Sequence, residues 1–422
     1  MVNVEKYWSS LEGKLHKARE RALEAIYLDF QIDLRSKKSA KPQDRAIIQK
    51  HVEEDASPWV KSNGNRSGKW PHPRADLSLD IRVFTREKNS PRIDVICKWL
   101  LDELGSSDAG EVIYRDDRQV KWLFASKSVL ETAPLEDPRT VQLLEEVKES
   151  LAPKNAHIYV IGQTLANRKA DIKLAITLDP PWNSRNENNN PFVKPDFEQD
   201  FSEIDEILNY STNKIFPGLK DELRHERKYQ KQAALIESFD NIIPSIILQF
   251  GIDPDHFTGQ TLRWLKQSPY VFDLGPMPTS SGGTTIFKKS TREKFALRSS
   301  QFSELFPPLT VVGVSLVYFE TQQGKDLDNL IRIVLPILLD EIRPPLKDIP
   351  NLKLHSKETK KDSNNSCSKE SGIQFVEAVS FSNGQGLAPP GTVLLILSSG
   401  WRRNSWWEEA SEYLYEFPSG KY

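Results

Sequence analysis

Apolar and polar residues alternate most regularly between residues 75 and 84, where Leu77, Leu79, Ile81 and Val83 are separated by polar side chains. A period of two is typical of a strand with one buried face. The apolar run at 309–319 predicts a second strand, and residues 111–127 predict a turn followed by a strand. Further strands are predicted at 157–162, 172–177, 270–274, 373–381 and 391–398.

Apolar residues spaced three or four apart predict helices between these strands. The predicted helices cover 4–28, 44–54, 95–104, 291–306 and 326 to about 342, and residues 203–267 have the pattern of a helical spacer. Gly105 follows the third of these helices, as is typical of a helix C-terminus. The succession of helices and strands predicts an α+β fold.

The chain has 422 residues, enough for two to four domains. Changes in composition predict an N-terminal helix with a basic polar segment, a first module, a linker with a helical spacer, a second module and an aromatic tail. The corresponding ranges are 1–74, 75–180, 181–267, 268–400 and 401–422. Residues 351–372 are polar and low in complexity, which predicts a disordered loop.

Several classes of protein are excluded by composition. There is no long uncharged apolar run and no apolar core in the first 21 residues, so we expect neither a membrane span nor a secretory signal. Two cysteines, Cys97 and Cys367, and seven scattered histidines give no disulfide framework or zinc site. We therefore expect a cytoplasmic protein. The net charge of −2 leaves room only for a local basic surface.

A strand, a polar turn, an aspartate, an amphipathic helix and another strand occur twice along the chain. Asp94 in the first copy corresponds to Asp328 in the second, a period of roughly 235 residues. This arrangement predicts two related modules, which could pair within one chain as a pseudo-dimer.

The first module combines carboxylates with a lysine. Asp94, Lys98 and Asp102 share one helix face, and Asp116 and Asp117 come before the next strand. A solvated helix face and an ordinary turn would explain them separately. Taken together, Asp94, Asp116 and Asp117 could hold Mg²⁺ or Mn²⁺, with Lys98 offsetting charge on a phosphate.

The second module carries Asp326, Asp328 and Asn329 directly after a strand, with Arg332 one turn later. Asp328 and Asn329 could serve only as helix N-caps. The basic neighbours Lys325 and Arg332 favour a phosphate site instead.

These segments resemble the RusA-type Holliday junction resolvases, whose pattern is D-x-D-N-x-x-K, a helix ending in D-x-L, and a D-D-x-Q-V strand. Residues 325–332 match the first element with Arg332 at the lysine, and residues 92–98 match it with Arg92 in place of the first acid. Residues 102–104 match the helix end, and 114–120 followed by Lys127 match the strand element. In the second module the later counterpart, 371–376, has neither acid.

The resemblance implies two modules of a Mg²⁺-dependent endonuclease that acts on branched DNA during recombination or repair, and a homodimeric family arrangement that this chain could reproduce internally. The implied metal ligands are Asp94, Asp116 and Asp117 in one module and Asp326 and Asp328 in the other. Lys98 and Arg332 would stabilise the phosphate. Homo-oligomers remain open.

Phosphate contacts dominate nucleic-acid affinity, so basic clusters are the expected DNA-binding surface. The candidates are Lys127, Lys288, Lys289, Arg292, Lys294 and Lys325. A solubilising surface would explain them equally well. The missing acids favour an alternative function, a catalytically degenerate scaffold that binds DNA structures. A protein-interaction module without a DNA role is the third hypothesis.

Overall fold

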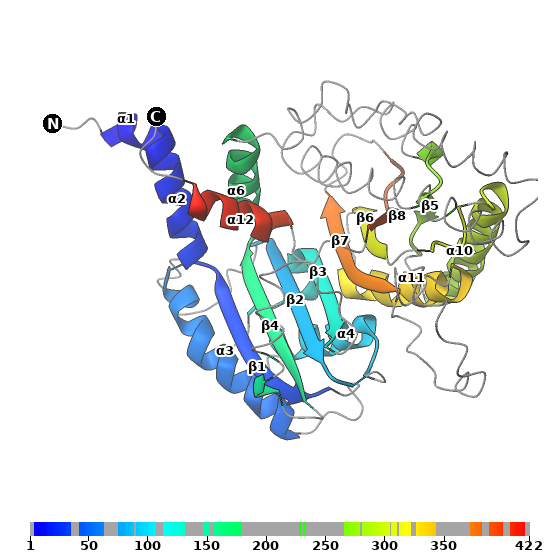
Figure 1. Ribbon diagram of the computed structural model, residues 1–422, viewed down its shortest axis with the longest axis horizontal. Coiled ribbons are helices and arrows are strands. Elements are labelled where there is room, and N and C mark those ends of the chain that lie inside the picture. The colour runs from blue at the N-terminus through cyan, green and yellow to red at the C-terminus, as the bar shows by residue number, and fades with distance from the viewer. Residues whose placement is uncertain are drawn as a thin grey trace, which may run out of the picture.

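The computed structural model is an α+β protein built on one mixed sheet of eight strands with helices on both faces (Figure 1). It describes residues 4–34, 42–62, 75–87, 90–105, 113–130, 147, 149–151, 155–178, 228, 232, 266–278, 281–303, 305–309, 312–321, 326–342, 372–381, 388–399 and 406–417. The α+β class predicted from the sequence is confirmed.

Each half of the chain contributes four strands to the sheet. The first half supplies β1 (Ile26–Asp33), β2 (Leu77–Thr85), β3 (Val120–Val129) and β4 (Asn155–Thr164). The second half supplies β5 (Val271–Pro276), β6 (Val312–Phe319), β7 (Ile373–Phe381) and β8 (Thr392–Ser399). The strand order across the sheet is β1-β4-β2-β3-β7-β6-β8-β5.

The two halves have the same topology and meet about a pseudo-twofold axis. In each half the two inner strands, β2 with β3 or β6 with β7, are parallel, and the other pairings are antiparallel. The halves join where β3 runs antiparallel to β7, with Phe124 opposite Glu377. Exchanging the halves maps this pair onto itself. The two halves therefore share one strand order and form one continuous sheet.

Helices from both halves line one face of the sheet. Helix α3 (Pro42–Ser62) packs on β1, α10 (Ser281–Gln301) packs on β5, and α4 (Ile93–Leu104) and α11 (Leu327–Glu341) pack on each other over the join. The inward residues of the strands beneath them are apolar, such as Leu79, Ile81 and Val83, each at most 1% exposed. Burying each such side chain contributes about 1.5–3 kcal/mol.

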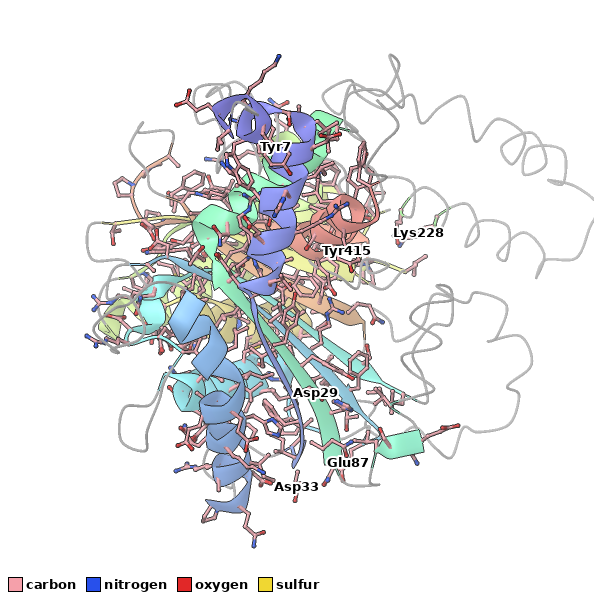
Figure 2. The ribbon with its side chains drawn as sticks, turned by 90° about the vertical axis from the view of Figure 1, so that its left-hand side faces the viewer. Tyr7, Asp29, Asp33, Glu87, Lys228 and Tyr415 are labelled. Carbon is pink, nitrogen blue, oxygen red and sulfur yellow. The ribbon has the colours of Figure 1, made fainter. Side chains whose placement is uncertain are left out.

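The N- and C-terminal helices lie together at one end of the molecule. Helices α1 (Val4–Ser9) and α2 (Leu11–Leu23) precede β1, and α12 (Trp406–Glu416) packs against α2 and α6 (Leu165–Leu178). Figure 2 shows Tyr7 and Tyr415 toward this end, with Asp29 and Asp33 farther along β1. The salt bridge between Arg82 of β2 and Glu408 of α12 places α12 on the face opposite α4. The predicted N-terminal segment and C-terminal tail thus belong to the first half.

Several predicted elements differ from the structure. The helix predicted at 291–306 is α10, which begins at Ser281 and ends at Gln301. The strand predicted at 172–177 was wrong, because these residues belong to α6, which buries Ile172 and Ala175 one turn apart. The helix predicted at 4–28 ends at Leu23, and the chain continues as β1. The predicted disordered loop lies outside the described residues apart from Gly372, as does the spacer apart from Lys228, Gln232 and residues 266–267. Among the helices in the described ranges, none has the length and apolarity to cross a bilayer.

Candidate metal centre

Three carboxylates from different halves of the chain gather beside the join. Asp326 and Asp328 lie at the start of α11, and Asp117 lies in the turn before β3. One oxygen from each lies within 4.8 Å of the others. The carboxylates grouped with Asp117 thus come from the second half of the chain, whereas the sequence predicted the ligands of each metal within one module.

The turn before β3 presents Asp117 because Gln119 ties it to the sheet. The Gln119 amide donates to the Ala75 carbonyl at 3.0 Å and accepts from the amides of Arg115 and Asp116 at 2.9 and 3.2 Å. Asp116 caps the short 3-10 helix Asp117–Gln119 and pairs with the exposed Arg118 guanidinium. These contacts hold Asp116 in the turn, and the Asp117 carboxylate lies near the start of α11.

The first turn of α11 supplies the other two carboxylates. Asp326 is the N-cap residue and accepts from the Asn329 side chain at 2.8 Å. Asp328 is 1% exposed, and its Oδ1 has no hydrogen-bond donor. Leaving a buried carboxylate oxygen without a partner costs free energy. The orphaned oxygen beside two other carboxylates fits a divalent cation, which prefers oxygen ligands.

Lys98 of α4 crosses the join to reach this cluster. Its Nζ lies 3.0 Å from Asp328 Oδ2, 3.0 Å from Asp102 Oδ1 and 3.5 Å from Asp117 Oδ2. The nearby carboxylates raise the pKa of Lys98 against the opposing effect of burial. Lys98 therefore stays charged and partly balances the four acids around it.

Burial and mutual repulsion disfavour the charged carboxylates. The pKa of Asp117 is raised to about 6, chiefly by burial and further by Asp328 and Asp326, although Lys98 lowers it. The pKa of Asp328 is raised for the same main reason, with Lys98 again opposing. A bound cation would reverse these effects, since it favours the ionised ligands.

The raised pKa of Asp117 predicts a pH-dependent stability. Because the folded state binds this proton more tightly than the unfolded state, the stabilisation is complete below about pH 4 and is lost as pH rises through about 6. We expect the free energy of unfolding of the wild type, relative to Asp117→Asn, to rise by about 2 kcal/mol between pH 7.5 and 4.5 without metal.

Urea unfolding at both pH values measures this difference. Mg²⁺ should stabilise the wild type more at pH 7.5 than at pH 4.5, since the protonated carboxyl is a poor ligand. If the difference in unfolding free energy between the wild type and Asp117→Asn were the same at both pH values, the assignment would be contradicted.

The pseudo-equivalent position at the start of α4 has different chemistry. Asp94 is 2% exposed, and its Oδ2 accepts from Arg92 Nη2 at 3.0 Å. Arg92 is the N-cap of α4, as Asp326 is of α11. Burial raises the pKa of Asp94, while Arg92 and, across the join, Arg332 lower it. Lys98 and Arg332 thus each act on the aspartate of the other half.

The structure brings together only some of the predicted site residues. Asp117, Asp326, Asp328 and Lys98 converge, but the grouped ligands in the described part of the chain do not include Asp94 and Asp116. Arg332 is exposed and acts on Asp94, not on Asp328's cluster as expected.

The predicted DNA-binding residues have mixed environments. Lys289 and Arg292 are exposed on α10, whereas Lys288 and Lys294 are half-buried. Lys127 donates to the Pro91 carbonyl at 2.9 Å before α4. Lys325 lies outside the described residues. The exposed Lys289 lies 4.0 Å from Glu293 and Arg292 lies 3.7 Å from Glu341, so each has an acidic neighbour.

Sequence reasoning did not assign Asp102 and Gln119 a role at the site. Asp102 forms a salt bridge with Lys98, and the i,i+4 spacing of the two residues could have predicted this contact. Gln119 positions Asp117, and no local pattern marks that role.

Comparison of the chain with protein-family models, curated proteins and solved structures finds no match.

Proposed function

We propose that this protein is a Mg²⁺- or Mn²⁺-dependent endonuclease that cuts branched DNA such as a four-way junction, built from two RusA-like modules in one chain. The observation that carries the proposal is the composite cluster, in which a buried Asp328 oxygen without a donor faces Asp117 and Asp326.

The chemistry follows from the charges around the cluster. A divalent cation there would supply charge stabilisation and an activated water for phosphodiester hydrolysis. Asp117, Asp326 and Asp328 would hold it, and the Lys98 ammonium, released from carboxylates that the cation neutralises, would stabilise the phosphate oxygens. Arg118, exposed at the same edge and close enough to Asp326 to interact, would receive the flanking phosphate.

The pseudo-twofold axis supports a branched substrate. A four-way junction can itself adopt a twofold arrangement, so a twofold protein surface can contact two of its arms equivalently. The exposed Lys289 and Arg292 on α10 lie in the half that supplies Asp326 and Asp328. They would contribute sequence-independent affinity that falls with salt.

The second candidate function is a scaffold that binds DNA structures without cutting them. It is favoured by Arg92, which stands at the position of Asp326 in the other half and pairs with Asp94. An arginine cannot ligate a cation, so at least one of the two positions has lost a ligand.

Incubation with labelled four-way junction, flap and linear duplex in Mg²⁺ or Mn²⁺ separates these functions. We expect cleavage of the junction, reduced at least about 100-fold in Asp117→Asn because a ligand charge is lost. Asp273→Asn is the matched control and should retain cleavage, since Asp273 pairs with Lys266 on the edge strand β5. Tight junction binding without cleavage in either metal would favour the scaffold.

A further inference from the structure

The pseudo-twofold axis identifies equivalent residues in the two halves. Leu77 pairs with Val120 before a register shift, and Val312 pairs with Ile373 before the corresponding shift. The N-caps of α4 and α11 give the same correspondence, with Arg92 equivalent to Asp326. Asp94 is then equivalent to Asp328.

The register also corrects the sequence comparison of the later element. Asp117 lies three residues before Val120, and the residue three before Ile373 is Glu370, not a member of 371–376. Glu370 lies outside the described residues. Pro336 stands at the position of Asp102, so that carboxylate has no equivalent.

The two sets of residues differ strongly in charge. Around Asp328, four carboxylates face one lysine, a net charge of three negative. Around Asp94, among the described residues, the one carboxylate meets the cations of Arg92 and Arg332, which leaves one positive charge. A divalent cation is attracted to the first set and not to the second.

Arg92 supplies Asp94 with the positive charge that a metal ion would supply at Asp328. Its guanidinium donates to Asp94 Oδ2, which is the compensation that Asp328 would obtain from a metal. The Arg92 side chain is 38% exposed, so the arginine end of the pair is in contact with solvent. Asp94 Oδ1 has no hydrogen-bond donor among the described residues, as is also true of Asp328 Oδ1, so the two positions differ in net charge and not in an unpartnered oxygen.

We infer that this chain makes a single incision in each junction it binds, and that the product is a nicked molecule. This inference rests on the proposed function. At the Asp117–Asp326–Asp328 centre, water adds to one phosphorus, one phosphorus–oxygen bond to deoxyribose breaks, and the departing oxygen takes up a proton. The equivalent strand facing Asp94 and Arg92 meets no such centre and stays intact.

A supercoiled plasmid with an extruded cruciform tests the number of incisions. One cut releases the supercoiling, so the cruciform is reabsorbed before a second protein binds, whereas two cuts within one complex linearise the plasmid. We expect nicked circles to be the first product, at more than ten times the amount of linear plasmid. Linear plasmid as the first product would overturn the inference, and intact plasmid and junctions would contradict the proposed function.

Metal binding gives a readout that does not depend on cleavage. Titration of the full-length protein with Mn²⁺ should show at least tenfold weaker binding for Asp328→Asn and unchanged binding for Asp94→Asn. These two isosteric changes affect equivalent residues, so each is the control for the other. Equal weakening by both would show that both positions bind metal and would overturn the inference even if no substrate were cut.

Discussion

Asparagine at position 328 is expected to abolish Mg²⁺-dependent junction cleavage, with a loss of at least about 1,000-fold. The substitution keeps the volume but removes a charge that is 1% exposed and 3.0 Å from Lys98. It removes a ligand directly, so its effect should exceed the roughly 10–100-fold cost of losing an outer partner of a metal ligand. Single-turnover cleavage rates at saturating Mg²⁺ measure the loss.

Asp273→Asn is the matched control for this prediction. Asp273 is another aspartate of the second half, paired with a lysine, Lys266, at 2.6 Å, but it lies on β5 at the edge of the sheet. Its replacement should leave the cleavage rate within about twofold, since a surface ion pair contributes at most about 1 kcal/mol to stability. A normal cleavage rate in Asp328→Asn would show that the Asp117–Asp326–Asp328 cluster takes no part in the reaction.

The largest expected loss of stability comes from Asp80→Leu. Asp80 of β2 and Arg168 of α6 are both 0% exposed and form a salt bridge of 2.8 Å. The leucine would leave a fully buried guanidinium without its salt-bridge partner, although the Ser78 hydroxyl, the Ile161 carbonyl and the charge of Asp171 still act on it. Removing one partner of a buried pair costs about 3–5 kcal/mol. Urea unfolding with a helix signal measures the change.

The double variant Asp80→Leu with Arg168→Met distinguishes an unpaired charge from lost packing. It removes both charges, so we expect its stability to return to within about 1–2 kcal/mol of the wild type. The exposed pair of Lys50 and Glu54 provides a control, and Glu54→Gln should cost at most about 0.5 kcal/mol. A single Asp80→Leu variant as stable as the control would show that burial of this pair contributes nothing.

Local patterns predicted much of the fold, and the exceptions have physical causes. The strand at 77–85 follows from its alternating apolar residues, although the structure also buries the polar face that carries Ser78 and Asp80. The strand at 373–381 is buried at nearly every position. The strand β1 was missed, although Ile26, Leu28, Phe30 and Ile32 alternate as required. It follows α2 after only two residues, so its alternation reads as the last turn of a longer helix.

The candidate site could be predicted residue by residue but not as an arrangement. Asp117 and Asp328 both stood out by sequence spacing, and their meeting depends on the β3–β7 pairing between residues about 250 positions apart. The cross-join contacts of Lys98 and Arg332 have the same origin. Local spacing contains no information on such long-range pairing.

Because β3 pairs with β7 within one chain, the equivalent positions of Arg92 and Asp326 can change independently. In a dimer of identical chains, every substitution appears twice, so an arginine that fills one position fills both and ends the chemistry. Two copies encoded in succession within one polypeptide remove this constraint. A mutation at Arg92 leaves its counterpart Asp326 untouched. Residues of one half can thus change while the equivalent residues of the other half are kept.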